Sequence, residues 1–199
     1  MGIYQNPAAG GDAAFSAMYP AIPAGETWNP YDVQMATHSN TPDITRTYLL
    51  PVRIDRVQAW RGSVFRISAG AGNVKLGWYA HAAGKATGNP LAEIASTAVA
   101  AATVYEADFS SGDWTPDIGL YWLAVQVSDA TIRLMALTAS FPYTPRLVGA
   151  SAANGMGAAV GAAVRYVTGT TYGTLPDLTG HSFTEESVYR AGIAALRAR

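Results

Sequence analysis

Short runs of alternating hydrophobic and polar residues dominate the chain from Thr45 onward, and turn-forming residues separate them. In the run Asn73–Tyr79, Val74, Leu76 and Trp78 fall on one face and the residues between them on the other, which predicts a half-buried strand. Runs of this kind recur at a spacing of roughly 8–12 residues, typical of sandwiches and barrels. The pattern predicts strands near Tyr48–Val52, Arg53–Trp60, Val64–Ser68, Val74–Ala80, Leu91–Ala98, Thr103–Phe109, Leu120–Val127, Thr131–Ala136, Val164–Thr168 and Val188–Arg197.

Three further segments complete the interpretation. The stretch Ala83–Pro90 has the composition of a loop, and Leu120–Val125 is a β-branched and aromatic run that suits a central strand. The Gly/Ala tract 149–163 is predicted to be a long loop, since its glycines disfavour a helix. The terminal segment Glu185–Arg199 has helix-forming residues but also alternates, and we interpret it as a closing strand.

Residues 1–45 differ from the rest because they hold five prolines and several glycines. Proline fixes φ and removes a hydrogen-bond donor, so this density excludes a long helix or a central strand. Aromatic residues recur in the segment, unlike in a disordered tail, which predicts packing on its own sandwich or on a neighbour. We therefore predict an all-β protein with two parts, a Pro-rich extended arm at 1–45 and an antiparallel, jelly-roll-like β-sandwich at 46–199.

The charge content restricts the partners. Hydrophobic residues make up 49% of the chain and charged residues only 14%, against roughly 25% in an average soluble domain. Because interface cores are depleted in charge, this composition predicts a homo-oligomer or an assembly subunit. An ordinary Ala- and Gly-rich monomer is the alternative. The net charge of −1 without a basic patch argues against binding to nucleic acid.

The absence of cysteine excludes disulfides, thiolate metal sites and a cysteine nucleophile. The N-terminus has no cationic region followed by an apolar stretch, so no secretory signal is predicted. The most apolar stretches are too short to span a bilayer, and no membrane insertion is expected. These features predict a protein that is made in the cytoplasm without export machinery.

Three segments follow one another in an order that is typical of a known kind of module: Tyr48–Val57, then Val74–Tyr79 followed by a Gly/Pro loop, then Gly119–Val125. They resemble a β-sandwich module of tail-fibre, spike and minor structural proteins of phages, prophages and gene-transfer agents. The late segment Thr171–Asp177 is similar to a stretch near the C-terminal end of that module. The similarity spans roughly residues 46–199. Trp78 and the loop sequence Gly88-Asn89-Pro90 depart from the family pattern, so the shape of that loop is not carried over.

The resemblance implies a virion structural protein of a phage-like particle, made in the host cytoplasm, that contacts other virion proteins through residues 1–45. Such modules assemble as homo-oligomers, with trimers favoured, and attach to host surfaces, in particular to polysaccharide. A purely architectural role, as a capsid decoration protein or tail connector, is the alternative. The pattern contains no catalytic residues, so none is transferred and no enzyme activity, cofactor or metal is expected.

Candidate catalytic chemistry is sparse. The three histidines, His38, His81 and His181, lie far apart in sequence, match no zinc signature and are interpreted as surface or loop residues. Asp108, Asp113 and Asp117 flank a turn closely enough to suggest a glycosidase site or a Ca²⁺ site. However, Asp is also an ordinary turn residue, and the regular Asp spacing of a Ca²⁺-binding loop is absent. A polysaccharide depolymerase is therefore the less favoured hypothesis.

Aromatic residues favour a binding function. Trp60, Trp78 and Trp122 fall in predicted strands and are expected in the core. Other aromatics fall beside Pro or Gly in irregular segments, where they can stack on sugar rings or pack a subunit interface. The candidate ligand-binding residues are Trp28, Trp114, Asp113, Asp117, Tyr143 and Tyr172.

Overall fold

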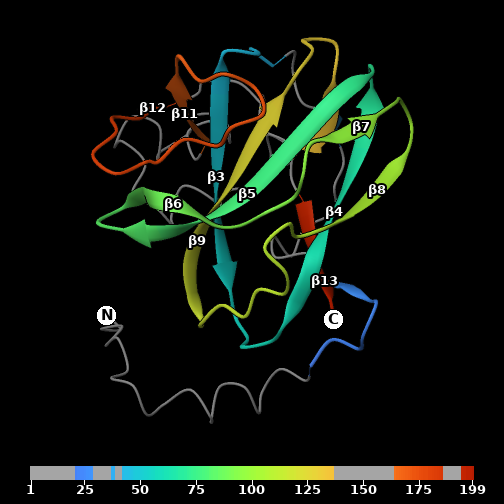
Figure 1. Ribbon diagram of the computed structural model, residues 1–199, viewed down its shortest axis with the longest axis vertical. Helices are drawn as coiled ribbons and strands as arrows, with labels where there is room; N and C mark the ends of the chain where they lie inside the picture. Colours follow the sequence, from blue (N-terminus) through green and yellow to red (C-terminus); the bar gives the residue numbers. More distant parts are fainter. Residues whose placement is uncertain (1–20, 29–36, 39–41, 137–163, 186–193) are drawn as a thin grey trace.

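The computed structural model describes residues 21–28, 37–38, 42–136, 164–185 and 194–199. These residues form strands, turns and irregular segments without a helix, and the strands make two antiparallel sheets that pack together (Figure 1). The predicted all-β sandwich is confirmed. A search of the described residues for a helix that could cross a membrane found none.

The first sheet has six strands in the order β1-β13-β4-β10-β2, with β8 on β4. Long-range pairing builds this sheet, since the C-terminal strand lies between two strands from the first third of the chain. The bounds are β1 Thr27–Trp28, β2 Thr37–His38, β4 Trp60–Ala69, β8 Val104–Asp108, β10 Arg133–Ala136 and β13 Ala194–Ala198.

The second sheet has seven strands in the order β12-β11-β3-β9-β5-β6, with β7 on β5. Strand β9 lies between β3 and β5 and is central, as its apolar run predicts. The bounds are β3 Arg46–Ile54, β5 Gly72–Ala82, β6 Lys85–Glu93, β7 Thr97–Val99, β9 Gly119–Val127, β11 Arg165–Thr168 and β12 Thr184–Glu185.

The main core fills the space between the sheets. Its strands contribute alternate residues, and Val74, Leu76 and Trp78 of β5 are all fully buried there, on the face that the period-2 pattern predicts. Trp60 joins this core, and the indole N–H of Trp78 donates a hydrogen bond to the Ser63 hydroxyl at 3.1 Å. The buried indole of Trp78 therefore has a polar partner inside the sandwich.

A second hydrophobic cluster covers the outer face of the seven-stranded sheet. Its members include Tyr79, Trp122 and Leu178, all buried, and the segment 171–183 supplies its outer layer. We call this segment the strap; in Figure 1 it is the orange loop beside β11 and β12. The prediction that β5 is half-buried is therefore wrong for its second half, because the strap covers the face that the pattern assigns to solvent.

The prediction of a loop at Ala83–Pro90 is also wrong. Only Ala83 and Gly84 form the turn, and both have positive φ, 47° and 81°, as in a type I′ hairpin. The chain pairs with β5 from Lys85 as strand β6, an edge strand, where the missing N–H of Pro90 is tolerated. Instead of the predicted strand Leu91–Ala98, β6 ends at Glu93 and the separate strand β7 begins at Thr97.

The predicted boundary between Tyr48–Val52 and Arg53–Trp60 does not exist. Strand β3 runs unbroken through Pro51, and residues 55–59 connect it to β4. Pro51 pairs with Trp122 of β9 on one side, and it lies beyond Leu49, the last β3 residue that pairs with β11. The proline therefore interrupts no ladder on that second side.

The described part of the N-terminal arm packs on its own sandwich. Strand β1 pairs with β13, and the backbone of Ile22 makes two hydrogen bonds with the Gln58 side chain, at 2.9 and 2.8 Å. Strand β13, Ala194–Ala198, overlaps the end of the predicted strand Val188–Arg197 and extends one residue past it. The Gly/Ala tract 149–163 and residues 186–193 lie outside the described residues.

Candidate functional site: a polar groove on the seven-stranded sheet

A groove of about 640 Å³ opens on the outer face of the seven-stranded sheet. Its floor is Lys75 of β5, and residues 89–93 of β6 form one side. Residues 110–111, in the turn after β8, and residues 173–175 of the strap complete the lining. The groove thus collects four segments that are distant in sequence.

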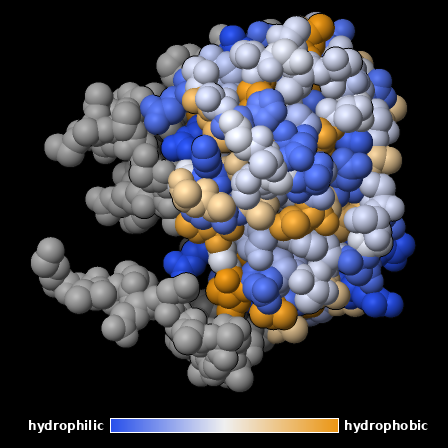
Figure 2. Space-filling model, turned by 60° about the vertical axis from the view of Figure 1, so that its left-hand side comes forward, coloured by the Kyte–Doolittle hydropathy of each residue, from blue (hydrophilic) through white to orange (hydrophobic). Residues whose placement is uncertain are grey.

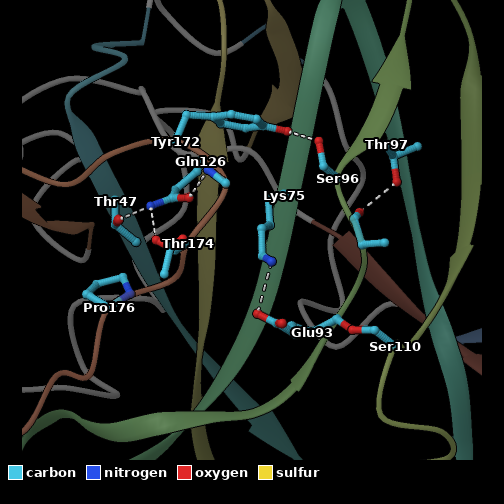
Figure 3. A network of polar contacts seen from close by, with 12 residues as sticks. Thr47, Lys75, Glu93, Ser96, Thr97, Ser110, Gln126, Tyr172, Thr174 and Pro176 are labelled. Atoms are coloured by element: carbon cyan, nitrogen blue, oxygen red, sulfur yellow. Dashed lines mark hydrogen bonds and ion pairs between the residues drawn. The ribbon is translucent and has the colours of Figure 1, made fainter.

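Lys75 and Glu93 form an ion pair at the bottom of this groove. The ammonium nitrogen and a carboxylate oxygen lie 3.4 Å apart, and the Lys75 side chain is only 11% exposed. Figure 3 shows the two side chains pointing toward one another from β5 and β6. Ser110 fixes the β6 side, since its backbone N–H and its hydroxyl both donate to the Glu93 carbonyl oxygen at 2.8 Å.

Gln126 of β9 holds the strap wall in place. Its buried amide nitrogen donates to the Thr47 hydroxyl at 2.9 Å and to the Thr174 carbonyl oxygen at 3.1 Å (Figure 3). Its amide oxygen accepts a hydrogen bond from the Gly173 N–H at 3.3 Å. A longer contact of 3.5 Å joins the amide nitrogen to the Thr171 carbonyl oxygen, so one side chain ties three strap residues to the sheet.

Apolar contacts and a tyrosine complete this anchoring. Gly77 of β5 lies under Leu175, where a side chain on residue 77 would collide with the leucine. The Tyr79 hydroxyl donates to the Pro176 carbonyl oxygen at 2.8 Å. Burial raises the pKa of Tyr79 far above its ordinary value, and the nearby carboxylates of Glu93 and Asp177 add to the shift, so the phenol keeps the proton that it donates.

Two of the predicted ligand-binding aromatics pack on the main core. Trp28 stacks on Trp60 with ring centroids 5.5 Å apart, and the Arg56 guanidinium lies 5.0 Å from the Trp28 ring. Trp114 contacts three aromatic rings, Trp78, Phe109 and Tyr121, with centroids 5.7, 6.2 and 5.4 Å away. These contacts favour a packing role for both tryptophans over stacking on a sugar.

The three aspartates around the Trp114 turn are not gathered into one site. The carboxylate of Asp113 pairs with Arg199 at 3.0 Å, and Asp108 pairs with Arg61 and Arg197. Asp117 contributes its backbone carbonyl oxygen, which accepts the Tyr121 hydroxyl at 3.0 Å. No group of three or more His, Asp or Glu suited to a metal ion occurs in the part of the chain that the structure describes.

Tyr172 is the predicted residue that lies closest in sequence to the groove lining. It is half-buried on the strap, next to Gly173, and its hydroxyl lies 2.6 Å from that of Ser96 (Figure 3). Burial raises its pKa. Tyr143 lies outside the described residues.

His81 is half-buried, unlike the surface or loop residue that we predict. Its Nδ1 accepts the indole N–H of Trp122 at 3.0 Å, and burial lowers the pKa of His81, with a further contribution from Arg165. His181 is exposed in the strap.

The groove residues themselves were missed by sequence reasoning. Lys75 and Glu93 become neighbours because β5 and β6 form a hairpin. The sequence prediction of a loop at Ala83–Pro90 does not include this hairpin. Even with the tight turn at Ala83 and Gly84 recognised, a regular hairpin register would place Ala92 opposite Lys75. The register shift between Trp78 and Ala80 instead places Glu93 opposite Gly77, diagonal to Lys75. Gln126 did have a signal, since it is a single amide in an otherwise apolar central strand.

The described surface shows scattered exposed hydrophobic side chains. Ile44, Val57, Leu91 and Val104 are 45–56% exposed and come from different segments. On the face in Figure 2, apolar areas are small and separated by polar ones. Dispersed exposure of this kind is normal for a soluble surface, so the homo-oligomer remains a prediction.

The sequence matches no protein-family model, and no match was found among the curated proteins or the solved structures.

Proposed function

We propose that this protein is a structural subunit of a phage-like particle that attaches to host-surface polysaccharide through the groove on the seven-stranded sheet. The observation that carries the attachment role is the groove itself, which combines a half-buried ion pair, hydroxyl and amide groups and an apolar side. Ligand sites commonly combine a shaped concavity with a few fixed polar groups. The role in a particle rests on the ordered resemblance of residues 46–199 and on the low charge content.

Binding without cleavage is the form of the proposal that the side chains favour. A glycosidase of the usual kind needs two carboxyl groups on opposite sides of the scissile bond. Glu93 is the only carboxylate among the described residues that line the groove, and it pairs with Lys75. Of the other candidates, Asp108 and Asp113 pair with arginines, and Asp117 does not line the groove. The proposed subunit therefore holds polysaccharide and leaves it intact.

The experiment combines localisation with binding. Purified particles are labelled with a gold-conjugated antibody against this chain, and the purified full chain is applied to a glycan array and to multi-angle light scattering. We expect label on the particle, binding to a set of oligosaccharides without fragment release, and a trimeric mass. Absence of the chain from every particle fraction refutes the proposal.

A purely architectural subunit is the second candidate, and the packing of Trp28 and Trp114 favours it because both rings serve the sandwich instead of a ligand. The same experiment separates the two. Label on the particle with no glycan binding supports the architectural role, while glycan binding supports attachment. Release of shorter oligosaccharides would instead identify a depolymerase.

A further inference from the structure

The charges in the groove are balanced. Among the described residues of the lining, Lys75 supplies the single cationic side chain and Glu93 the single anionic one, and they lie together at the floor. An acidic sugar that approaches the ammonium of Lys75 therefore meets the carboxylate of Glu93, 3.4 Å away. A cationic ligand that approaches the carboxylate of Glu93 is in turn repelled by the ammonium of Lys75. The electrostatics of the floor favour a ligand with no net charge.

From this balance we propose that the groove binds a neutral saccharide segment, whose hydroxyl groups bridge the ammonium of Lys75 and the carboxylate of Glu93. This inference rests on the proposed attachment function and specifies its ligand class. A sugar hydroxyl both donates and accepts, so one diol can accept from Lys75 and donate to Glu93 at the same time. The ion pair is then part of the binding site as well as of the fold.

The rest of the lining matches the same ligand. Asn89 offers two donors and an acceptor, while Ser111 and Thr174 each offer a hydroxyl that works in either direction. Pro90 and the 45% exposed Leu91 present apolar surface to the C–H face of a sugar ring. The described part of the lining contains no aromatic ring, so recognition by its residues proceeds by hydrogen bonds along the edge of the saccharide. A groove of about 640 Å³ is within the size range of drug-sized ligand sites, which is roughly 300–1,000 Å³.

The wall of the groove is prepared before any ligand arrives. Gln126 fixes Gly173 and Thr174 of the strap, and Ser110 fixes the backbone of Glu93. Groups that are already held in place lose little conformational entropy on binding, so a modest set of hydrogen bonds is sufficient for measurable affinity.

The test is a titration of the ¹⁵N-labelled full chain with defined probes, followed by NMR chemical-shift mapping. The neutral probes are maltohexaose, chitohexaose, cellohexaose and mannohexaose, and the acidic probes are hyaluronan hexasaccharide and hexagalacturonate. We expect at least one neutral probe to shift the amides of Leu91, Ser111 and Gly173, and the acidic probes to bind at least tenfold more weakly.

The decisive variant is Glu93→Gln, which keeps the shape and removes the acceptor charge. We expect about tenfold weaker binding of the neutral probe and a gain in binding of the acidic probes, because the charge of Lys75 is then unbalanced. Glu106→Gln is the matched control, an exposed glutamate of β8 on the other sheet, and should leave both affinities unchanged. The amide spectrum of each variant verifies that it is folded.

Three outcomes overturn the inference: no shift with any neutral probe, tighter binding of the acidic probes to the unmodified chain, or shifts that map away from the groove. In the last two cases, the attachment function survives with a different ligand or site. Failure of the proposed function is seen separately, as absence of the chain from the particle or absence of binding on the glycan array, and does not depend on these titrations.

Discussion

The substitution Gln126→Leu tests how the strap is held on the sheet. Leucine is similar in size to glutamine, so the change leaves little cavity and chiefly removes hydrogen bonds. The amide nitrogen loses its contacts with the Thr47 hydroxyl and with the carbonyl oxygens of Thr171 and Thr174. The amide oxygen loses the Gly173 N–H. The expected effect is local release of the strap together with a loss of global stability.

The magnitude follows from the burial of the groups that are left behind. An unsatisfied buried polar group costs about 1–3 kcal/mol. Gln126 is buried, but Gly173 is half-buried and Thr174 is exposed, so water can replace part of what is lost at the strap. We therefore expect a loss of about 2 kcal/mol in the free energy of unfolding, and a fall in Tm of about 4–8 °C for a chain of this length.

The assay is urea unfolding followed by tryptophan fluorescence, combined with amide hydrogen exchange. The exchange of the Gly173 N–H should accelerate in the Gln126→Leu variant. Thr47→Val is the matched control, because it removes the hydroxyl partner of Gln126 on β3 and leaves the contacts of Gln126 with the strap in place. That control should lose some stability while the exchange at Gly173 stays slow.

Two results would refute this reasoning. If Gln126→Leu unfolds at the same urea concentration as the unmodified chain, the buried amide does not stabilise the fold. If the exchange at Gly173 is unchanged while global stability falls, contacts other than Gln126 hold the strap.

Three further predictions test other parts of the molecule. In Gly62→Ala the new methyl group would collide with a backbone carbonyl of β8, so urea unfolding should show a loss of about 1–3 kcal/mol, while Gly119→Ala, whose nearest neighbour is 3.7 Å away, should change little. Trp28→Ala removes a partly buried stack on the core and should cost about 1–3 kcal/mol with glycan affinity unchanged, whereas a sugar-stacking role requires the reverse. The pKa of His81 is lower in the folded state than in the unfolded state. Between these two pKa values the folded state binds fewer protons, so Tm should fall as the pH drops below about 6.5. This fall should be smaller in His81→Gln, which does not titrate; equal slopes would show that protonation of His81, which removes the acceptor of the Trp122 bond, does not weaken the fold.

The sandwich could be predicted because a sheet that buries one face leaves a local signature. Val74, Leu76 and Trp78 alternate with more polar residues and lie in the main core, as predicted. Leu120–Val125 is apolar on both faces and forms part of the central strand β9. Periodicity failed at the hairpin because turn residues continue into β6, where Gly88 and Pro90 are accepted on an edge strand that pairs, among the described strands, with β5 alone.

The candidate site could not be predicted from local sequence patterns. In the sequence, Trp28, Trp114 and Asp113 are candidates for ligand binding. In the fold, each tryptophan packs on another aromatic ring and Asp113 pairs with an arginine. The groove could not be read in advance, because its four segments meet only after the strap has crossed the sheet. Residues 171–178 have no periodic pattern of their own, so their position is set by the contacts that they make with the sheet beneath them.

The sequence by itself therefore determined the fold class, most of the strands and the main core, because the alternation of side chains across a strand is a property of neighbouring residues. Tertiary structure alone decided the order of the strands, the second cluster under the strap and the pairing of Lys75 with Glu93. These features depend on contacts between residues far apart in the chain, and their free energy appears only when both partners are in place.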